Sequence, residues 1–202
     1  MEVRIDTNYS PAEIQELCAM LVSSGVVTPQ EMAREEAFFQ GLELDFLSIN
    51  NLLLPFWEKF VGHSMVERDL AIRLHGHDAF YRPFTQRLLD RSPLGRHAPR
   101  CTIAPHSGEL TVRAGEHAGG FLFRTYPDYL AGVSRLLNSL FHQEGADAAY
   151  HPIGFDEAVY FLLLTESQYQ YLLTHRVLLF RGVEYPEIEA WRATLTDEDR
   201  VF

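Results

Sequence analysis

The sequence predicts an α+β fold in which a helical N-terminal half is followed by a small, mostly antiparallel sheet with helices. The first 90 residues contain the same helix-start signal three times. After residue 101 the pattern changes to short apolar runs separated by glycine, which is typical of strands and hairpins. Residues 91–100 hold two prolines and a glycine without apolar periodicity, so we interpret them as a linker. We therefore expect a helical domain over residues 1–92 and an α+β domain over residues 101–202.

The helix-start signal in the N-terminal half is a capping box. A serine or threonine hydroxyl accepts a hydrogen bond from the third backbone N–H of the helix, and a glutamate at that third position reaches back to the N-cap backbone. Gly25 can end the first of these helices and Gly41 the second. The three boxes are Ser10-Pro11-Ala12-Glu13, Thr28-Pro29-Gln30-Glu31 and Ser64-Met65-Val66-Glu67.

Two further segments complete the N-terminal half. Residues 42–60 read as a helix that is either continuous or interrupted at Pro55. Asp78 can cap another helix, which carries Phe80 and Phe84 on one side. We expect the whole N-terminal half to be a helical layer.

Short strands and helices are expected in the C-terminal half. Glycine-containing turns separate the first three strands, and the strongest β run of the chain comes later. A capping box that uses glutamine follows this run directly. The expected strands cover residues 101–104, 109–113, 120–124 and 158–164, the expected helices begin at Tyr126 and Thr165 and cover residues 186–195, and residues 177–180 are ambiguous.

Negative charge limits the partners that this chain can have. Its formal net charge is −11 and its pI is near 5.2. Nucleic acids and anionic membranes both favour clustered positive charge, so we expect neither as the main ligand. Residues 91–124 are an exception, because five arginines against two glutamates give them a net charge of +3. The middle of the sequence is therefore a basic island in an acidic chain.

The sequence favours a cytoplasmic location. No run approaches the ~18 consecutive apolar residues of a membrane-spanning helix. The first residues lack the basic-then-apolar layout of a secretory signal. The two cysteines, Cys18 and Cys101, are too few for a disulfide framework or a thiolate metal site, so we expect buried, reduced thiols.

No segment matches a self-sufficient catalytic motif. His75-Gly76-His77-Asp78 resembles part of a metallohydrolase signature, but the second aspartate-histidine step is missing, and we interpret it as a pair of solvated histidines at a helix end. Ser107 lies in a His-Ser-Gly sequence that fits a hairpin turn better than a nucleophile elbow. The loop at residues 114–120 has glycines but no lysine for a phosphate. We therefore expect no catalysis by this chain alone.

A basic strand and the helix after it form the best candidate for a binding site. At the edge of a sheet, the strand at residues 120–124 can accept an extended acidic peptide by strand addition, with arginines recognising its carboxylates. The alternative is an interior strand with arginines at its rim. The candidate peptide-binding residues are Arg113, Phe121, Leu122, Phe123, Arg124, Leu130 and Arg135.

The C-terminal half resembles a known family of accessory proteins. Cys101-Thr102-Ile103 opens a strand, an amphipathic helix follows, and Phe155-Asp156-Glu157-Ala158-Val159-Tyr160-Phe161-Leu162 forms a late strand. In this order, and in its helical front half, the chain looks like the small partner subunits of multinuclear non-haem iron peptide-modifying enzymes. These subunits accompany TIM-barrel iron oxygenases in the methanobactin and 3-thiaglutamate pathways.

The resemblance implies a division of work between two subunits. The large partner would hold two or three irons and oxidise a cysteine of a ribosomally made precursor peptide with dioxygen. The small subunit would hold that precursor peptide through a winged-helix-like peptide-recognition module. The resemblance implies no cofactor in this chain, iron in the partner, and no catalytic residue to transfer.

Two other functions stay open. A compact, acidic, aromatic-rich chain suits an immunity or inhibitor protein that masks a basic toxin surface. A small metal-dependent enzyme would be built around His75 and His77, with His97 or His117 as a further ligand. The identity of a co-purifying protein separates the first two functions, and the metal content of the purified chain tests the third.

Overall fold

A computed structural model describes residues 5, 7–104, 108–155 and 158–195. Within these residues, helices are combined with two three-stranded antiparallel sheets, which confirms the α+β class. The strands are β1 (Phe60–Ser64), β2 (Arg100–Ala104), β3 (Glu109–Ala114), β4 (His117–Leu122), β5 (Ala149–Phe155) and β6 (Ala158–Leu164). The α-helices are α1 (Pro11–Ser23), α2 (Pro29–Arg34), α3 (Glu36–Gln40), α4 (Met65–His75), α5 (Asp78–Asp90), α6 (Tyr126–Gln143), α7 (Glu166–Thr174) and α8 (Pro186–Arg192), and the 3₁₀ helices are η1 (Ile49–Lys59) and η2 (Pro93–His97).

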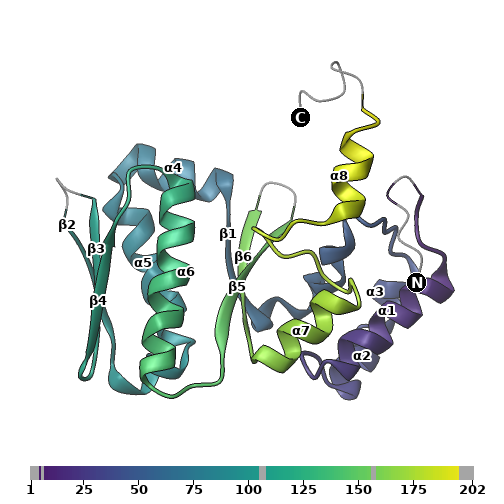
Figure 1. Ribbon diagram of the computed structural model, residues 1–202, viewed down its shortest axis with the longest axis horizontal. Helices are drawn as coiled ribbons and strands as arrows, with labels where there is room; N and C mark the ends of the chain where they lie inside the picture. The colour runs from purple at the N-terminus through teal and green to yellow at the C-terminus, as the bar shows by residue number, and fades with distance from the viewer. Residues whose placement is uncertain (1–4, 6, 105–107, 156–157, 196–202) are drawn as a thin grey trace.

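These elements form alternating layers (Figure 1). The first sheet, β2-β3-β4, lies at one end, and α5 and α6 separate it from the second sheet, β1-β6-β5. Helix α7 and the N-terminal helices α1–α3 lie beyond the second sheet. The largest cluster of buried apolar side chains fills the space around α5 and α6 between the two sheets. Helix α6 therefore packs between the sheets and can form one wall of a site there.

All four predicted capping boxes are present. The hydroxyl of each N-cap residue accepts from the third backbone N–H, and the glutamate or glutamine at that position reaches back. A fifth box, formed by Thr125 and Asp128, begins α6. The four predicted boxes begin at Ser10, Thr28, Ser64 and Thr165.

Two details of the predicted helices were wrong, and the interruption at Pro55 was confirmed. The second helix is broken at Glu35, whose backbone is not helical, so α2 and α3 are separate and Gly41 ends α3. Asp78 is the first residue of α5 and His77 occupies the N-cap. The apolar segment before β1 is a 3₁₀ helix with non-helical backbone angles at Phe56, directly after Pro55.

The first sheet contains the three strands expected after residue 100. Strand β3 pairs with β2 on one side and with β4 on the other, in register with Cys101 opposite Val112 and Val112 opposite Gly119. The third strand covers His117–Leu122 instead of residues 120–124. Within the described residues β4 has a strand neighbour on one side only, so it is an edge strand.

The second sheet corrects the expectation of an entirely helical N-terminal half. Strand β1 pairs with β6, and Gly62 lies opposite Tyr160, whose ring occupies the space that a Cβ would take. This pairing is a long-range contact, and the short sequence of β1, with its glycine, carries no strand pattern of its own. Strand β5 contains Pro152 and was not expected either. The sheet joins residues from both sides of the expected boundary, and the division into two domains stays a prediction.

The expected linker is part of the packed structure. Residues 93–97 form η2, and Leu94 is fully buried in the largest core cluster. Arg91 Nη1 donates to the carbonyl of Phe60 over 3.1 Å, which fixes the segment against β1.

Both cysteines are buried free thiols, as expected, and burial raises the pKa of Cys18 and Cys101 to about 11. Among the described helices, none has the length and apolar character needed to cross a membrane.

Candidate functional site

A groove of about 790 Å³ lies between the N-terminal half of α6 and the second sheet. We call it the α6 groove. Its volume is within the range of ligand-binding clefts in proteins. The walls are mainly apolar, and among the described residues that line the groove the charged ones are two arginines. The lining residues are Met65, Tyr126, Pro127, Leu130, Ala131, Ser134, Arg135, Pro152, Ala158, Val159, Arg181 and Gly182.

The two arginines of the α6 groove come from different elements. Arg135 lies on α6, and its Nε donates to the carbonyl of Ala131 over 3.2 Å. Arg181 follows the segment that bridges to β5, and its backbone N–H donates to the carbonyl of Pro152 over 2.8 Å. Within the described residues neither guanidinium has a carboxylate partner. The groove therefore presents positive charge that no described side chain of the protein neutralises.

Tyr126 forms part of the groove wall, and its hydroxyl is hydrogen-bonded to His63. The Tyr126 hydroxyl and His63 Nε2 are 2.8 Å apart, and His63 Nδ1 is 3.0 Å from the carbonyl of Ser64. A carbonyl oxygen accepts, so Nδ1 carries the hydrogen, and Nε2 accepts from the tyrosine. His63 is 2% exposed, and burial lowers its pKa. The imidazole is thus neutral and fixes the orientation of the Tyr126 ring.

Arg68 adds a third positive charge beside the groove. Its guanidinium carbon lies 4.3 Å from the centre of the Tyr126 ring, a cation–π contact. It also bonds to Asp69, so its charge is partly neutralised. Burial raises the pKa of Tyr126, which keeps the hydroxyl protonated as a donor. The Tyr126 side chain is therefore an uncharged, fixed part of the groove wall, and the guanidinium group of Arg68 lies beside it.

The α6 groove brings together two of the seven residues predicted from the sequence, Leu130 and Arg135. Phe121 packs its ring against Gly132 of α6, and Phe123 is 8% exposed within the core. Leu122, which alternates with them, is 67% exposed on the opposite face of the first sheet. The two phenylalanines therefore connect β4 to α6 and do not line the groove.

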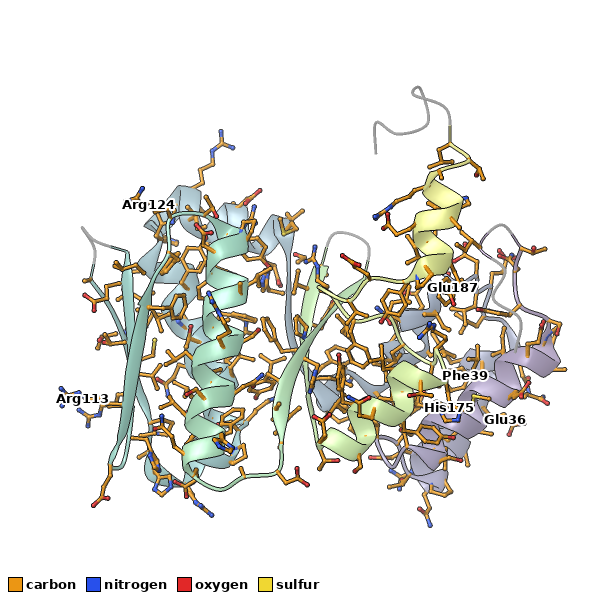
Figure 2. The ribbon with its side chains drawn as sticks, in the orientation of Figure 1. Glu36, Phe39, Arg113, Arg124, His175 and Glu187 are labelled. Carbon is orange, nitrogen blue, oxygen red and sulfur yellow. The ribbon has the colours of Figure 1, made fainter. Side chains whose placement is uncertain are left out.

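The other two predicted residues, Arg113 and Arg124, lie apart from the groove and from each other. Figure 2 shows Arg113 projecting from the outer side of the first sheet, away from α6. Arg124 lies beyond the end of β4, where its backbone N–H donates to Asp128 Oδ2 over 3.4 Å. Ala118 is the partner of Arg113 on β4, and the six residues from there to Arg124 span roughly 20 Å at the rise of a strand. One extended ligand in the groove would not contact both.

Several groove residues were not predicted. Met65 lines the groove, and His63 contacts the Tyr126 hydroxyl; these two residues flank Ser64 at the end of β1, the strand that sequence periodicity did not reveal. Arg181 follows residues 177–180, whose secondary structure was ambiguous, and an isolated bridge between Ile153 and Phe180 now places that segment beside β5. The apolar run before Arg181 was the available signal, but its partner strand β5 was needed to interpret it.

The four histidines considered as metal ligands divide into two places. His77 precedes α5 and His97 follows it, and a helix of 13 residues is about 20 Å long. His97 and His117 meet at Glu144, with their Nε2 atoms 3.0 and 2.7 Å from its two carboxylate oxygens. In the described ranges, no three histidine, cysteine, aspartate or glutamate side chains are grouped to hold a metal ion.

The Glu144 cluster is a charged contact between η2, β4 and α6. Arg96 pairs with the same carboxylate oxygen as His97. Hydrogen bonds from His97 and Arg96 lower the pKa of Glu144 to about 2. Both carboxylate oxygens are already engaged by protein donors. The cluster therefore connects the C-terminus of α6 to η2 and β4.

A second groove, of about 740 Å³, lies among α1, α2 and α3. Ile14, Cys18 and Phe39 contribute to its apolar walls, and Glu36 is the charged residue among those that line it. Figure 2 shows Glu36 and Phe39 at this helical end of the molecule, far from Arg113. No arginine or lysine is among the described residues that line this groove, so they offer no positive charge for an acidic ligand.

Comparisons of the chain with protein-family models, with curated proteins and with solved structures found no match.

Proposed function

We propose that this chain is an accessory subunit that binds a ribosomally made precursor peptide in the α6 groove and presents the peptide's cysteine to an iron-dependent oxygenase of the TIM-barrel type. The observation that carries the proposal is the combination, in one groove, of apolar walls with the guanidinium groups of Arg135 and Arg181, which have no described carboxylate partner. Apolar contact supplies affinity, and paired arginines supply selectivity for carboxylates.

The length of the groove suits a short stretch of extended peptide. From Tyr126 to Arg135 the helix rises about 14 Å at the usual rise per residue. Roughly four residues of an extended chain cover that distance. The expected occupant is therefore a segment in which apolar side chains face Leu130 and Met65 while an acidic side chain reaches the two arginines.

Side chains, more than strand addition, are expected to hold the peptide at this place. Where the groove meets β5, the backbone of that strand is already engaged, since Arg181 donates to Pro152 and Ile153 bridges to Phe180. Strand β4 is an edge strand, as strand addition would require. Its aromatic side chains, however, are packed against α6, so the β4 edge offers backbone groups with few side-chain pockets.

The partner and its iron follow from the resemblance of the C-terminal half to the small subunits of peptide-modifying iron enzymes. In such a pair this chain supplies peptide recognition, and the larger subunit supplies oxidation. The formal charge of −11 suits a partner with a basic docking surface.

The proposal is tested by purifying the tagged chain from its native host, alongside an Arg181→Glu variant and an Arg73→Glu variant. Arg73 is an exposed arginine on α4 outside the groove, so it controls for the change of charge. Mass spectrometry and iron analysis identify what accompanies each form. We expect the unaltered chain and the Arg73 variant to retain an iron protein and a cysteine-containing peptide, and the Arg181 variant to lose the peptide. Co-purification of a basic toxin, without an iron protein or a peptide, would establish the inhibitor function instead. Equal amounts of peptide with all three forms would show that the peptide does not bind in the α6 groove.

A further inference from the structure

Two arginines stand directly opposite each other on the outer face of the first sheet. Arg100 of β2 is the register partner of Arg113 of β3, and both side chains are exposed. Like charges at directly opposed positions of a sheet destabilise it. Within the described residues neither arginine has a carboxylate partner, although the chain has 28 acidic residues for 17 basic ones. The pair is thus an unneutralised concentration of positive charge in an acidic protein.

The arginine pair lines a pocket of about 310 Å³. The next residues on the same face, Thr102 and Thr111, are also register partners, and their hydroxyl oxygens are 2.7 Å apart. Since one of these hydroxyls donates to the other, the second has its hydrogen available for a ligand. The guanidinium groups and this hydroxyl are all donors, which is the chemistry that an oxyanion requires.

The far wall of the pocket is built from the segment between η2 and β2 and from the turn between β3 and β4. Ala98 has a left-handed backbone with φ of 46°, which is uncommon for a residue with a Cβ. Gly115 has φ of 61°, and a Cβ there would lie 3.2 Å from His97 Nδ1. Nε2 of His97 is held by Glu144, so the imidazole forms a fixed wall. The pocket therefore has a defined shape beside the two exposed guanidinium groups.

We propose that this pocket binds the phosphate group of a small phosphomonoester, or free phosphate, between Arg100 and Arg113. Two facing arginines carry two positive charges, which one carboxylate cannot neutralise. A phosphate monoester carries nearly two negative charges at neutral pH, and its tetrahedral oxygens accept from both guanidinium groups and a threonine hydroxyl. The outer face of the sheet is separated from the α6 groove by β3 itself, whose residues Leu110 and Val112 face the core. The site is independent of the proposed peptide site.

The test is calorimetric titration of the whole chain with potassium phosphate, phenyl phosphate and potassium acetate at matched ionic strength. Arg100→Gln and Arg113→Gln each remove one cation, and Arg73→Gln is the control with the same change of charge on α4. We expect both phosphates to bind, each pocket variant to lose about tenfold or more in affinity, and the control to match the unaltered chain. Tighter binding of phenyl phosphate identifies a phosphomonoester site, and tighter binding of inorganic phosphate identifies a free-phosphate site.

A second measurement needs no variant. Phosphomonoesters gain their second negative charge near pH 6, so the affinity for phenyl phosphate should rise between about pH 5 and pH 7.5. Three results would each overturn the proposal: no binding of either phosphate, acetate binding as tight as phosphate binding, or equal affinity in the pocket variants and the control. None of these results bears on peptide binding in the α6 groove.

Discussion

The hydroxyl of Tyr126 donates to Nε2 of the buried His63 over 2.8 Å, and this bond joins the first turn of α6 to the end of β1. Substituting Tyr126→Phe keeps the ring but leaves a buried imidazole nitrogen without its donor. We expect a loss of about 1–3 kcal/mol in the free energy of unfolding, measured by urea denaturation. Tyr171→Phe is the matched control, because no hydrogen bond of the Tyr171 hydroxyl is seen among the described residues. A similar loss in both variants would contradict the role of the bond.

The neutral state of His63 makes the fold sensitive to mild acid. Burial lowers its folded-state pKa below the ordinary value of about 6.5, so the unfolded chain binds a proton more readily than the folded one. Stability is therefore fully present above about pH 6.5 and declines as the pH falls toward the folded-state pKa. Arg68 and Arg87 lower this pKa further, whereas Glu67 raises it.

Urea denaturation at a series of pH values tests this dependence. His63→Gln should lose less stability than the unaltered chain between pH 6.5 and the onset of carboxylate protonation. His151 has a pKa lowered by burial too, so part of the dependence should persist in the variant. The exposed His175 provides the control, and His175→Gln should follow the unaltered chain. If the stability of the His63 variant fell with pH as much as that of the unaltered chain, the loss in mild acid would come from other groups.

Asn50 joins three segments that are distant in sequence. Its side-chain N–H groups donate to the carbonyls of Gly154 and Leu179, each over 2.9 Å, and its oxygen accepts from the Leu179 backbone over 2.8 Å. Asn50 is 4% exposed, so removal of the amide leaves these backbone groups unsatisfied in the interior. Asn50→Ala should cost about 2–5 kcal/mol of stability, measured from thermal or urea unfolding. The neighbouring Asn51→Ala, whose side chain has no described hydrogen bond, should cost much less.

Gly132 allows α6 to lie close to β4. A Cβ at this position would be 2.2 Å from ring carbons of Phe121. Gly132→Ala should therefore overpack the interface and lower stability by about 1–3 kcal/mol, although alanine favours a helix more than glycine does. Adding Phe121→Leu should recover part of the loss, since it removes the obstructing ring. Gly154→Ala meets no atom of the described residues within 4 Å and serves as the control. Stabilisation by Gly132→Ala alone would show that the ring moves aside at little cost.

Local signals in the sequence predicted the helix starts better than the sheets. A capping box is complete within four residues, so Ser10, Thr28, Ser64 and Thr165 could each be assigned without knowledge of the fold. Strand β1 exists because β6 pairs with it, and its own five residues carry no alternating pattern. Strands β1 and β5 were both missed, so the second sheet could not be predicted.

The candidate site shows the same limit. The sequence placed Leu130 and Arg135 on the same helix, directly after the basic strand, and both line the groove. It also grouped Phe121 and Phe123 with them, because adjacency in sequence does not reveal which face of β4 the helix covers. Arg181 joins the groove through a tertiary contact with β5 that only the fold provides.

The position of the peptide can be decided by comparing Arg135→Glu with Arg124→Glu. The sequence pattern grouped both residues in one site, whereas the structure places Arg135 in the α6 groove and Arg124 outside it. We expect charge reversal at Arg135 to weaken binding about tenfold or more, because it replaces an attractive contact by a repulsive one. Arg124→Glu should have little effect. Fluorescence anisotropy with a labelled synthetic peptide of alternating leucine and glutamate provides the measurement, and the same peptide with lysine in place of glutamate provides the control. A greater loss from Arg124→Glu than from Arg135→Glu would move the peptide to the edge of β4.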